Sequence, residues 1–213
     1  MRQYYAARAE EYDRVYAKPE RQADIRRLQA WLPAQFAGAR VLDVAAGTGF
    51  WTESFAPVTR EVVLVDAAHE TLSIARRRLS SENVRFFVGD AYKLPVRSGT
   101  FDAAFVGFWF SHIPKRQRAT FLEGLVGSVR PGGRVVMMDN RAVEVSSHPV
   151  SGTDDDGNTY QIRRLDDGTI HRVLKNFPSE EELVNAVRRY GSDVRYWGLE
   201  YYWVLTFSTG GVG

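Results

Sequence analysis

The chain has 213 residues, a length that suits a single domain with one hydrophobic core. Hydrophobic residues make up 44% of it and charged residues 25%, which excludes a disordered or low-complexity protein. The 28 Lys and Arg residues nearly balance the 26 Asp and Glu residues, so there is no basic excess of the kind that nucleic-acid-binding proteins carry. The absence of cysteine excludes disulfides, zinc–thiolate sites and a thiol nucleophile.

Signals of export or membrane insertion are also missing from the sequence. Residues 1–22 are polar and of mixed charge, without the apolar segment of a signal peptide. No run approaches the roughly 18 apolar residues that a membrane-spanning helix needs. We therefore expect a cytoplasmic protein that does not associate with membranes.

The N-terminal part of the chain predicts two helices. The first covers residues 2–16 and places tyrosines seven and four positions apart on one stripe (Tyr5, Tyr12 and Tyr16). The second follows Pro19, has apolar residues three and four positions apart, and is expected to stop at Pro33.

Five short apolar runs then alternate with helix-forming stretches. The expected strands are RVLDVAAG (40–47), EVVLVD (61–66), VRFFVGD (84–90), FDAAFVGF (101–108) and RVVMMD (134–139). Helices are expected between them, at 50–56, 69–79 and 115–129. Apolar strands that alternate with helices form βαβ units, so the pattern predicts a parallel sheet covered by helices on both faces.

The pattern changes after residue 140. Two strand-like runs at 158–165 and 169–176 flank the turn signal Asp-Asp-Gly and predict a β-hairpin. Ser179 precedes three glutamates and is expected to cap a helix. Runs at 193–197 and 199–207 predict two closing strands that pair antiparallel with each other.

Acidic residues and a glycine turn occur where the first three expected strands end. Asp43 lies in the first strand, and the Gly47-Thr48-Gly49 turn leads from it into a helix; the second strand ends at Asp66 and the third at Asp90. A glycine turn lets backbone N–H groups approach a ligand, and the carboxyl ends of parallel strands meet at one edge. Three acids there suit a ligand with hydroxyl groups and an amine better than a pyrophosphate. A dinucleotide turn is disfavoured, because Thr52 stands where its third glycine belongs.

These motifs resemble those of class I S-adenosylmethionine-dependent methyltransferases over residues 41–139, and the closing strands agree with that family to residue 208. The first motif of the family reads acidic-x-Gly-x-Gly-x-Gly. Here it reads Asp43-x-Ala45-x-Gly47-x-Gly49, with a small alanine for the first glycine, and looks like the variant of quinone-biosynthesis methyltransferases. The Pro-Gly-Gly-Arg stretch before the fifth strand also fits. The resemblance implies an enzyme that uses S-adenosyl-L-methionine and releases S-adenosyl-L-homocysteine.

The resemblance further implies a fold and a domain organisation. The fold is a Rossmann-like α/β domain with a seven-stranded, mostly parallel sheet and an antiparallel final strand. One domain would cover residues 1–213. Its parts are N-terminal lid helices at 1–33, the donor-binding core at 40–139, the hairpin insert at 151–177, and the last helix with the closing strand pair at 178–208.

The same resemblance implies roles for individual residues. Asp43 and the turn around Gly47 would hold the methionine end of the donor, Asp66 the two ribose hydroxyls, and Asp90 the adenine. The full set of expected donor-binding residues is Tyr4, Tyr12, Asp43, Ala45, Gly47, Gly49, Asp66, Ala67, Asp90, Ala91, Gly107 and Phe108.

In that family the loop after the fourth strand lies beside the transferred methyl group. Here residues 107–114 lack the Asn/Asp-Pro-Pro-Tyr/Phe stretch of enzymes that methylate nucleic-acid adenines or glutamine amides. The catalytic candidates are Trp109 as an aromatic wall on the acceptor side, His112 as a proton acceptor, and Tyr5 from the first helix. A structural role for His112 and ordinary packing of the N-terminal tyrosines are the alternatives.

The sequence therefore predicts methyl transfer to O, N or C of a small aromatic or heteroaromatic metabolite by a monomer or homodimer. The alternatives are a methyltransferase of RNA or protein, and a non-catalytic donor-binding scaffold. No nucleic-acid partner is expected, and no metal, because the histidines lack metal-ligand spacing. The charges of the insert (Arg163, Arg164, Arg172 and Lys175) and the Arg76-Arg77-Arg78 run are expected to face solvent.

Overall fold

A computed structural model describes residues 8–143 and 149–210. Its main sheet has seven strands in the order β3-β2-β1-β4-β5-β10-β9. The strands are β1 (Arg40–Val44), β2 (Glu61–Asp66), β3 (Val84–Val88), β4 (Phe101–Gly107), β5 (Val129–Asn140), β9 (Gly191–Gly198) and β10 (Tyr202–Thr209). The first five pair in parallel, and β10 runs antiparallel to both of its neighbours. The predicted mostly parallel sheet with an antiparallel final strand is confirmed.

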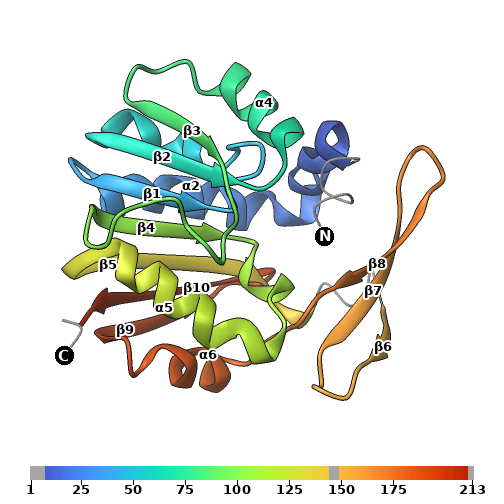
Figure 1. Ribbon diagram of the computed structural model, residues 1–213. Helices are drawn as coiled ribbons and strands as arrows, with labels where there is room; N and C mark the ends of the chain where they lie inside the picture. The colour runs from blue at the N-terminus through green and yellow to red at the C-terminus, as the bar shows by residue number, and fades with distance from the viewer. Residues whose placement is uncertain (1–7, 144–148, 211–213) are drawn as a thin grey trace.

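Helices cover both faces of this sheet (Figure 1). One face packs against α2 (Gln22–Phe36), α3 (Thr52–Phe55) and α4 (His69–Arg78), and the other against α5 (Arg118–Ser128) and α6 (Glu180–Val187). The division follows the alternation of strand side chains: Val41 belongs to the first core, and Leu42 and Val44 to the second. Short 3-10 turns complete the connections: η3 (Ala56–Val58), η4 (Phe110–His112) and η5 (Lys115–Gln117).

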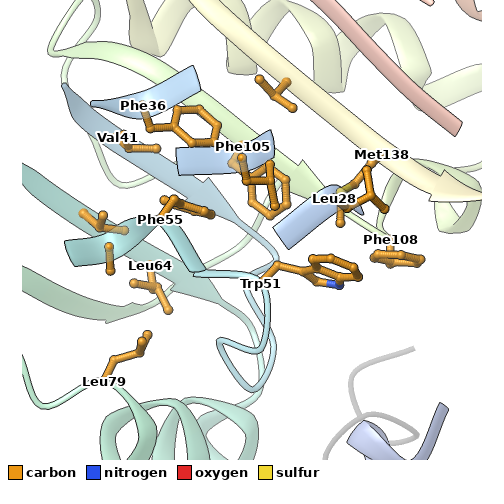
Figure 2. Packing of buried hydrophobic residues seen from close by; sticks show 14 of the residues in the cluster. Leu28, Phe36, Val41, Trp51, Phe55, Leu64, Leu79, Phe105, Phe108 and Met138 are labelled. Atoms are coloured by element: carbon orange, nitrogen blue, oxygen red, sulfur yellow. The ribbon is translucent and has the colours of Figure 1, made fainter. Parts of the chain in front are cut away.

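The helix after Pro19 does not stop at Pro33, as the sequence predicted, but continues to Phe36. Phe36 is fully buried and packs against Phe55 with ring centroids 4.6 Å apart. Burying such a ring contributes about 2–3 kcal/mol, which is comparable with the cost of a proline inside a helix. Figure 2 shows Phe36 among the side chains between α2 and the sheet.

The N-terminal segment is described from residue 8 onward and forms two 3-10 helices, η1 (Ala9–Tyr16) and η2 (Pro19–Arg21). Tyr16 is buried and stacks on Phe50 with ring centroids 4.0 Å apart. Its ring also meets Trp51 and Phe108 edge to face. The expected helix over residues 2–16 is therefore a 3-10 helix over its described part, and Tyr4 and Tyr5 lie outside the described residues.

The insert is a separate three-stranded antiparallel sheet rather than a hairpin alone. Its strands are β6 (Val150–Thr153), β7 (Thr159–Arg164) and β8 (Ile170–Leu174), in the order β6-β7-β8. The predicted pairing of β7 with β8 around Asp166-Asp167-Gly168 is present, and β6 was not predicted. This small sheet projects away from the main sheet, and its tip rises beside the N-terminal segment (Figure 1).

Ser179 caps α6 as predicted. Its side chain accepts a hydrogen bond from the Glu182 backbone N–H, and the Glu182 carboxylate accepts one from the Ser179 backbone N–H. This capping box satisfies N–H groups at the start of the helix. The helix consequently begins directly after the insert, whose base lies against the end of β5.

Candidate functional site

A cavity lies at the carboxyl ends of β1, β2 and β4. In the strand order, β1 and β4 are neighbours although β2 and β3 separate them in the chain. This is the switch point at which open α/β sheets bind ligands. We call it the first cavity; its lining is Tyr12, Ala45, Gly47, Val65, Asp66, Ala67, Ala68, Thr71, Gly89, Asp90, Ala91, Tyr92, Gly107, Phe108 and Trp109.

The turn after β1 takes left-handed backbone conformations beside this cavity. The φ angles are 56° at Ala45, 58° at Gly47 and 71° at Gly49. A left-handed conformation costs an L-residue about 1–2 kcal/mol that glycine does not lose. Alanine at position 45 is therefore strained as well as small, and strain held beside a cavity is typical of ligand-binding backbone. Gly49 itself packs toward α4, where an added Cβ would lie 2.9 Å from a Leu79 methyl carbon.

Asp66, the last residue of β2, lines the first cavity. One carboxylate oxygen accepts the Gly47 N–H at 2.9 Å, and the other accepts the Ala68 N–H at 2.8 Å and lies 3.1 Å from the Thr71 hydroxyl. Burial raises the pKa of Asp66, and these hydrogen bonds oppose the shift. A carboxylate offers about four acceptor positions, so Asp66 keeps acceptor capacity for a ligand in the first cavity.

Asp43 lies in β1 behind the turn and is 1% exposed. Its Oδ2 accepts the Thr52 hydroxyl at 2.5 Å, whereas its Oδ1 has no hydrogen-bond partner among the described residues. Burial raises the pKa of Asp43 to about 7. Asp43 lines a smaller hollow, the turn cavity, which shares Tyr12, Ala45, Gly47 and Gly107 with the first cavity. A buried carboxylate oxygen at that place suits a cationic amino group.

Aromatic side chains line the part of the first cavity that follows β3 and β4. Tyr92 and Trp109 meet edge to face with ring centroids 6.2 Å apart, and Asp90 and Ala91 lie beside them in the lining. The Trp109 indole N–H is buried and has no hydrogen-bond partner within the described part of the chain. A flat, aromatic slot with a carboxylate and an indole N–H matches a heteroaromatic base. Trp109 thus lines the first cavity, and its expected place on the acceptor side stays a prediction.

Hydrogen bonds and an ion pair join the N-terminal segment to the glycine turn and to α4. Arg78 donates to the Thr48 carbonyl at 2.7 Å and pairs with Asp13, which accepts the Thr48 hydroxyl at 2.6 Å. Arg78 is therefore not a solvent-facing charge, because it joins α4, the turn and η1. Next to this junction Tyr12 lines both the first cavity and the turn cavity, and burial raises its pKa to about 12. Tyr12 is consequently a neutral phenol at physiological pH.

A second cavity adjoins the first. Tyr12 and Phe108 line both, so these two rings form the partition between them. The complete lining of the second cavity is Arg8, Tyr12, Val15, Tyr16, Phe108, His112, Asn140, Arg163, Val173 and Lys175. It lies between the N-terminal segment, the loop after β4 and the insert.

His112 borders the second cavity. Its Nδ1 lies 2.6 Å from the Leu174 carbonyl oxygen, which only accepts, so Nδ1 carries the proton. Burial and the Lys175 charge lower the pKa of His112 to about 3. His112 is therefore neutral throughout the physiological range, and the activity limb near pH 6.5 that an ordinary histidine base would give is not expected from it.

A buried ion pair holds the insert against the main sheet. Lys175 Nζ lies 2.9 Å from Asp139 Oδ1, and the two side chains are 3% and 0% exposed. Lys175 also donates to the Ser111 hydroxyl at 2.8 Å, and the Ser111 N–H donates to Asp139 at 2.9 Å. The Lys175 charge lowers the pKa of Asp139 despite burial. The expectation that Lys175 would face solvent is therefore wrong.

The structure gathers most of the residues that the sequence singled out. The first cavity is lined by ten of them: Tyr12, Ala45, Gly47, Asp66, Ala67, Asp90, Ala91, Gly107, Phe108 and Trp109. Asp43 lines the adjoining turn cavity, Gly49 shapes the turn from behind, and His112 faces the second cavity. The sequence reasoning missed Thr71, Tyr92, Asp139, Arg163 and Lys175. For Thr71 a signal exists, because it lies five residues past Asp66 on the first turns of α4.

Comparisons with known proteins agree with this geometry. Residues 41–133 match the family model described as a methyltransferase domain. The demethylmenaquinone methyltransferase of Paenarthrobacter aurescens is 34% identical over 113 residues, which cover 53% of this chain and 41% of that protein. The ubiquinone/menaquinone biosynthesis C-methyltransferase of Ectopseudomonas mendocina is 36% identical over 109 residues, which cover 48% and 42%. The chain thus spans less than half the length of these curated relatives.

A solved structure matches much more of the chain. DhpI in complex with SAH superposes with a TM-score of 0.81 at 28% identity, and the match covers 98% of this chain and 95% of that one. Over residues 41–133 this chain matches a methyltransferase domain, and over nearly its whole length it shares the fold of DhpI. The seven-stranded sheet and the cavity at its switch point are the framework of that domain.

Two further observations bear on this methyltransferase domain. None of the helices within residues 8–143 and 149–210 combines the length and apolar composition needed to cross a membrane. Over the same residues, no three His, Cys, Asp or Glu side chains gather as a metal ion would require.

Proposed function

We propose that this chain is an S-adenosyl-L-methionine-dependent methyltransferase that acts on a small molecule and releases S-adenosyl-L-homocysteine. The observation that supports it most is the presence of three features in two adjoining cavities that share lining residues: the buried Asp43 oxygen without a partner among the described residues, Asp66 at the end of β2, and the aromatic slot of Tyr92 and Trp109. We assign them to the amino group, the ribose and the adenine of that donor.

In this proposal each residue binds one part of the donor. Asp43 pairs with the amino group, Asp66 accepts one ribose hydroxyl, and Asp90 with Tyr92 and Trp109 encloses the adenine. The backbone around Ala45 and Gly47 lies against the methionine portion. When bound, the donor supplies an electrophilic methyl group on a sulfonium, and the sulfur keeps the electron pair as the bond to the acceptor forms.

The protein contributes alignment and a dry environment to such a displacement. Tyr12 and Phe108 stand between the two cavities, so we place the methyl group at this partition and the acceptor in the second cavity. His112 lines the second cavity as a neutral imidazole and stays a candidate contact for the acceptor, although a pKa of about 3 makes it a weak base for taking the acceptor's proton at neutral pH. Tyr5 stays a candidate from the sequence only, since it lies outside the described residues.

The acceptor in this proposal is a small molecule, not RNA or protein. The curated relatives are named as quinone methyltransferases, which act on small molecules. A cytoplasmic location and a monomeric or homodimeric state belong to the same proposal.

Turnover of the donor tests this function. The purified protein is incubated with the donor and a panel of small phenolic, heteroaromatic and acidic acceptors, and the demethylated product is quantified. We expect product with at least one acceptor, and a loss of about tenfold or more in kcat/KM for the donor when Asp66→Ala removes a charge-assisted hydrogen bond. Asp167→Ala, on the exposed turn of the insert, is the control. No product formation with any acceptor, with donor binding intact, would favour the non-catalytic scaffold.

A further inference from the structure

One of the three consecutive arginines at the end of α4 differs from its neighbours. Arg76 lies over the Phe86 ring at 5.3 Å, and Arg77 pairs with Glu10 at 3.3 Å, where both side chains are mostly exposed. The Arg78 side chain is only 20% exposed. The contacts of Arg78 lie at the turn after β1, so this arginine alone of the three reaches the proposed donor site.

The Arg78 guanidinium holds the glycine turn through Thr48. Its Nη1 donates to the Thr48 carbonyl oxygen at 2.7 Å and lies 3.1 Å from the Thr48 hydroxyl oxygen. Thr48 is 2% exposed and lies between Gly47 and Gly49, whose φ angles are 58° and 71°. A turn with several left-handed residues keeps its shape only where its surroundings hold it. Asp66 holds the Gly47 N–H, so Arg78 and Asp66 fix consecutive residues of the turn.

The same contacts extend to the N-terminal segment through Asp13 of η1. One Asp13 oxygen accepts the Thr48 hydroxyl at 2.6 Å, and the other accepts a hydrogen bond from Arg78 Nη2. The Asp13 side chain is 30% exposed, so this charge-assisted pair is better shielded from water than a surface ion pair. Tyr12, the residue before Asp13, lines both the first cavity and the turn cavity. The turn and a wall of the two cavities are therefore held by one set of contacts.

We propose that Arg78, acting with Asp13 and Thr48, is a positioning residue for donor binding, which holds the glycine turn in its left-handed shape and couples it to the N-terminal segment. The inference rests on the proposed function, because it takes the first cavity and the turn cavity as the donor site. Arg78 lines neither cavity, so it acts on the donor through Thr48 and Tyr12. Because such coupling is reciprocal, a ligand that binds at the turn should in return stabilise η1.

Calorimetric titration with S-adenosyl-L-homocysteine tests this role, and Arg77 supplies the matched control. We expect Arg78→Gln to weaken binding about tenfold or more, because it removes charge-assisted hydrogen bonds to the turn and to Asp13, whereas Arg77→Gln should change it less than about twofold. Arg78→Lys keeps the charge without the planar fork and should recover part of the affinity. Asp13→Asn should also weaken binding. Combined with Arg78→Gln it should cost less than the product of the two single effects, because both residues act through one set of contacts.

Hydrogen exchange separates positioning from a general loss of stability. In the wild-type protein, S-adenosyl-L-homocysteine should slow amide exchange across η1, as measured by mass spectrometry. In Arg78→Gln at the same fractional saturation, this protection should be lost, while the amides of β4 stay as protected as in wild type.

Several outcomes would overturn the inference. They are an equal effect of Arg78→Gln and Arg77→Gln on affinity, no rescue by Arg78→Lys, and unchanged protection of η1 in Arg78→Gln. A loss of protection in β4 as large as that in η1 would show that Arg78 is structural only. If the wild-type protein fails to bind S-adenosyl-L-homocysteine, the proposed function fails and the donor role of Arg78 with it. If wild type binds and both arginine variants bind equally well, only the role of Arg78 fails.

Discussion

The substitution Lys175→Met tests how the insert is held at the site. It leaves Asp139 fully buried without its cationic partner, although the Ser111 and Asn140 N–H groups still donate to that carboxylate. Removing one member of a buried pair costs about 3–5 kcal/mol. For a chain of this length, where 1 kcal/mol shifts Tm by about 2–4 °C, the Tm should fall by roughly 6–20 °C.

Urea unfolding followed by near-ultraviolet circular dichroism measures this loss of unfolding free energy. A series of such measurements at different pH values shows whether the loss grows or shrinks with pH. With Lys175 present the pKa of Asp139 is lowered, so the pair contributes stability above the unfolded carboxyl pKa of about 3.9 and loses it as pH falls through the folded value. In Lys175→Met the deficit should therefore be largest near neutral pH and shrink toward about pH 4. The double variant with Asp139→Asn should recover part of the loss. A single-variant cost below about 1 kcal/mol, as exposed pairs give, would refute the account of this pair.

Three further predictions concern the cavities. Because the pKa of His112 is about 3, the pH profile of kcat between about pH 5.5 and 8 should have the same shape in wild type and His112→Ala; a limb near 6.5 present only in wild type would contradict this. Because the pKa of Asp43 is about 7 without a ligand, binding of a donor amino group should release close to one proton at about pH 6, measured by calorimetry in two buffers, and Asp43→Asn should abolish the release. Gly49→Ala should destabilise the protein by about 1–3 kcal/mol in thermal unfolding, since its φ is 71° and the new Cβ would lie 2.9 Å from Leu79; an unchanged Tm would show that the turn relaxes freely.

The main sheet could be predicted because each parallel strand is a continuous apolar run followed by a turn. The same pattern predicted that Asp66 and Asp90 would lie at one edge of the sheet, because the carboxyl ends of parallel strands meet there however long the connecting segments are. Both residues line the first cavity. Asp43 was predicted from its motif, but its unpartnered oxygen and raised pKa depend on how deeply β1 is buried. Those values follow from packing that no local pattern encodes.

The second cavity could not be predicted in the same way. Lys175 and Asp139 are 36 positions apart and pair only because the base of the insert meets the end of β5. Arg163 and Arg164 look alike in the sequence, and only the register of β7 decides which one faces inward. The strand β6, VSGT, is four residues long and mostly exposed, so it lacks the alternation that identifies a strand.

Calorimetric titration of S-adenosyl-L-homocysteine into the purified chain tests the central claim most directly. The account predicts one site with a micromolar dissociation constant, weakened about tenfold or more by Asp66→Ala and unaffected by Asp167→Ala. Asp66 is the informative position, because it lies at the end of β2 and joins the turn to the first cavity. Absence of binding by the wild-type protein, or equal affinity of wild type and Asp66→Ala, would contradict the assignment of the first cavity to the donor.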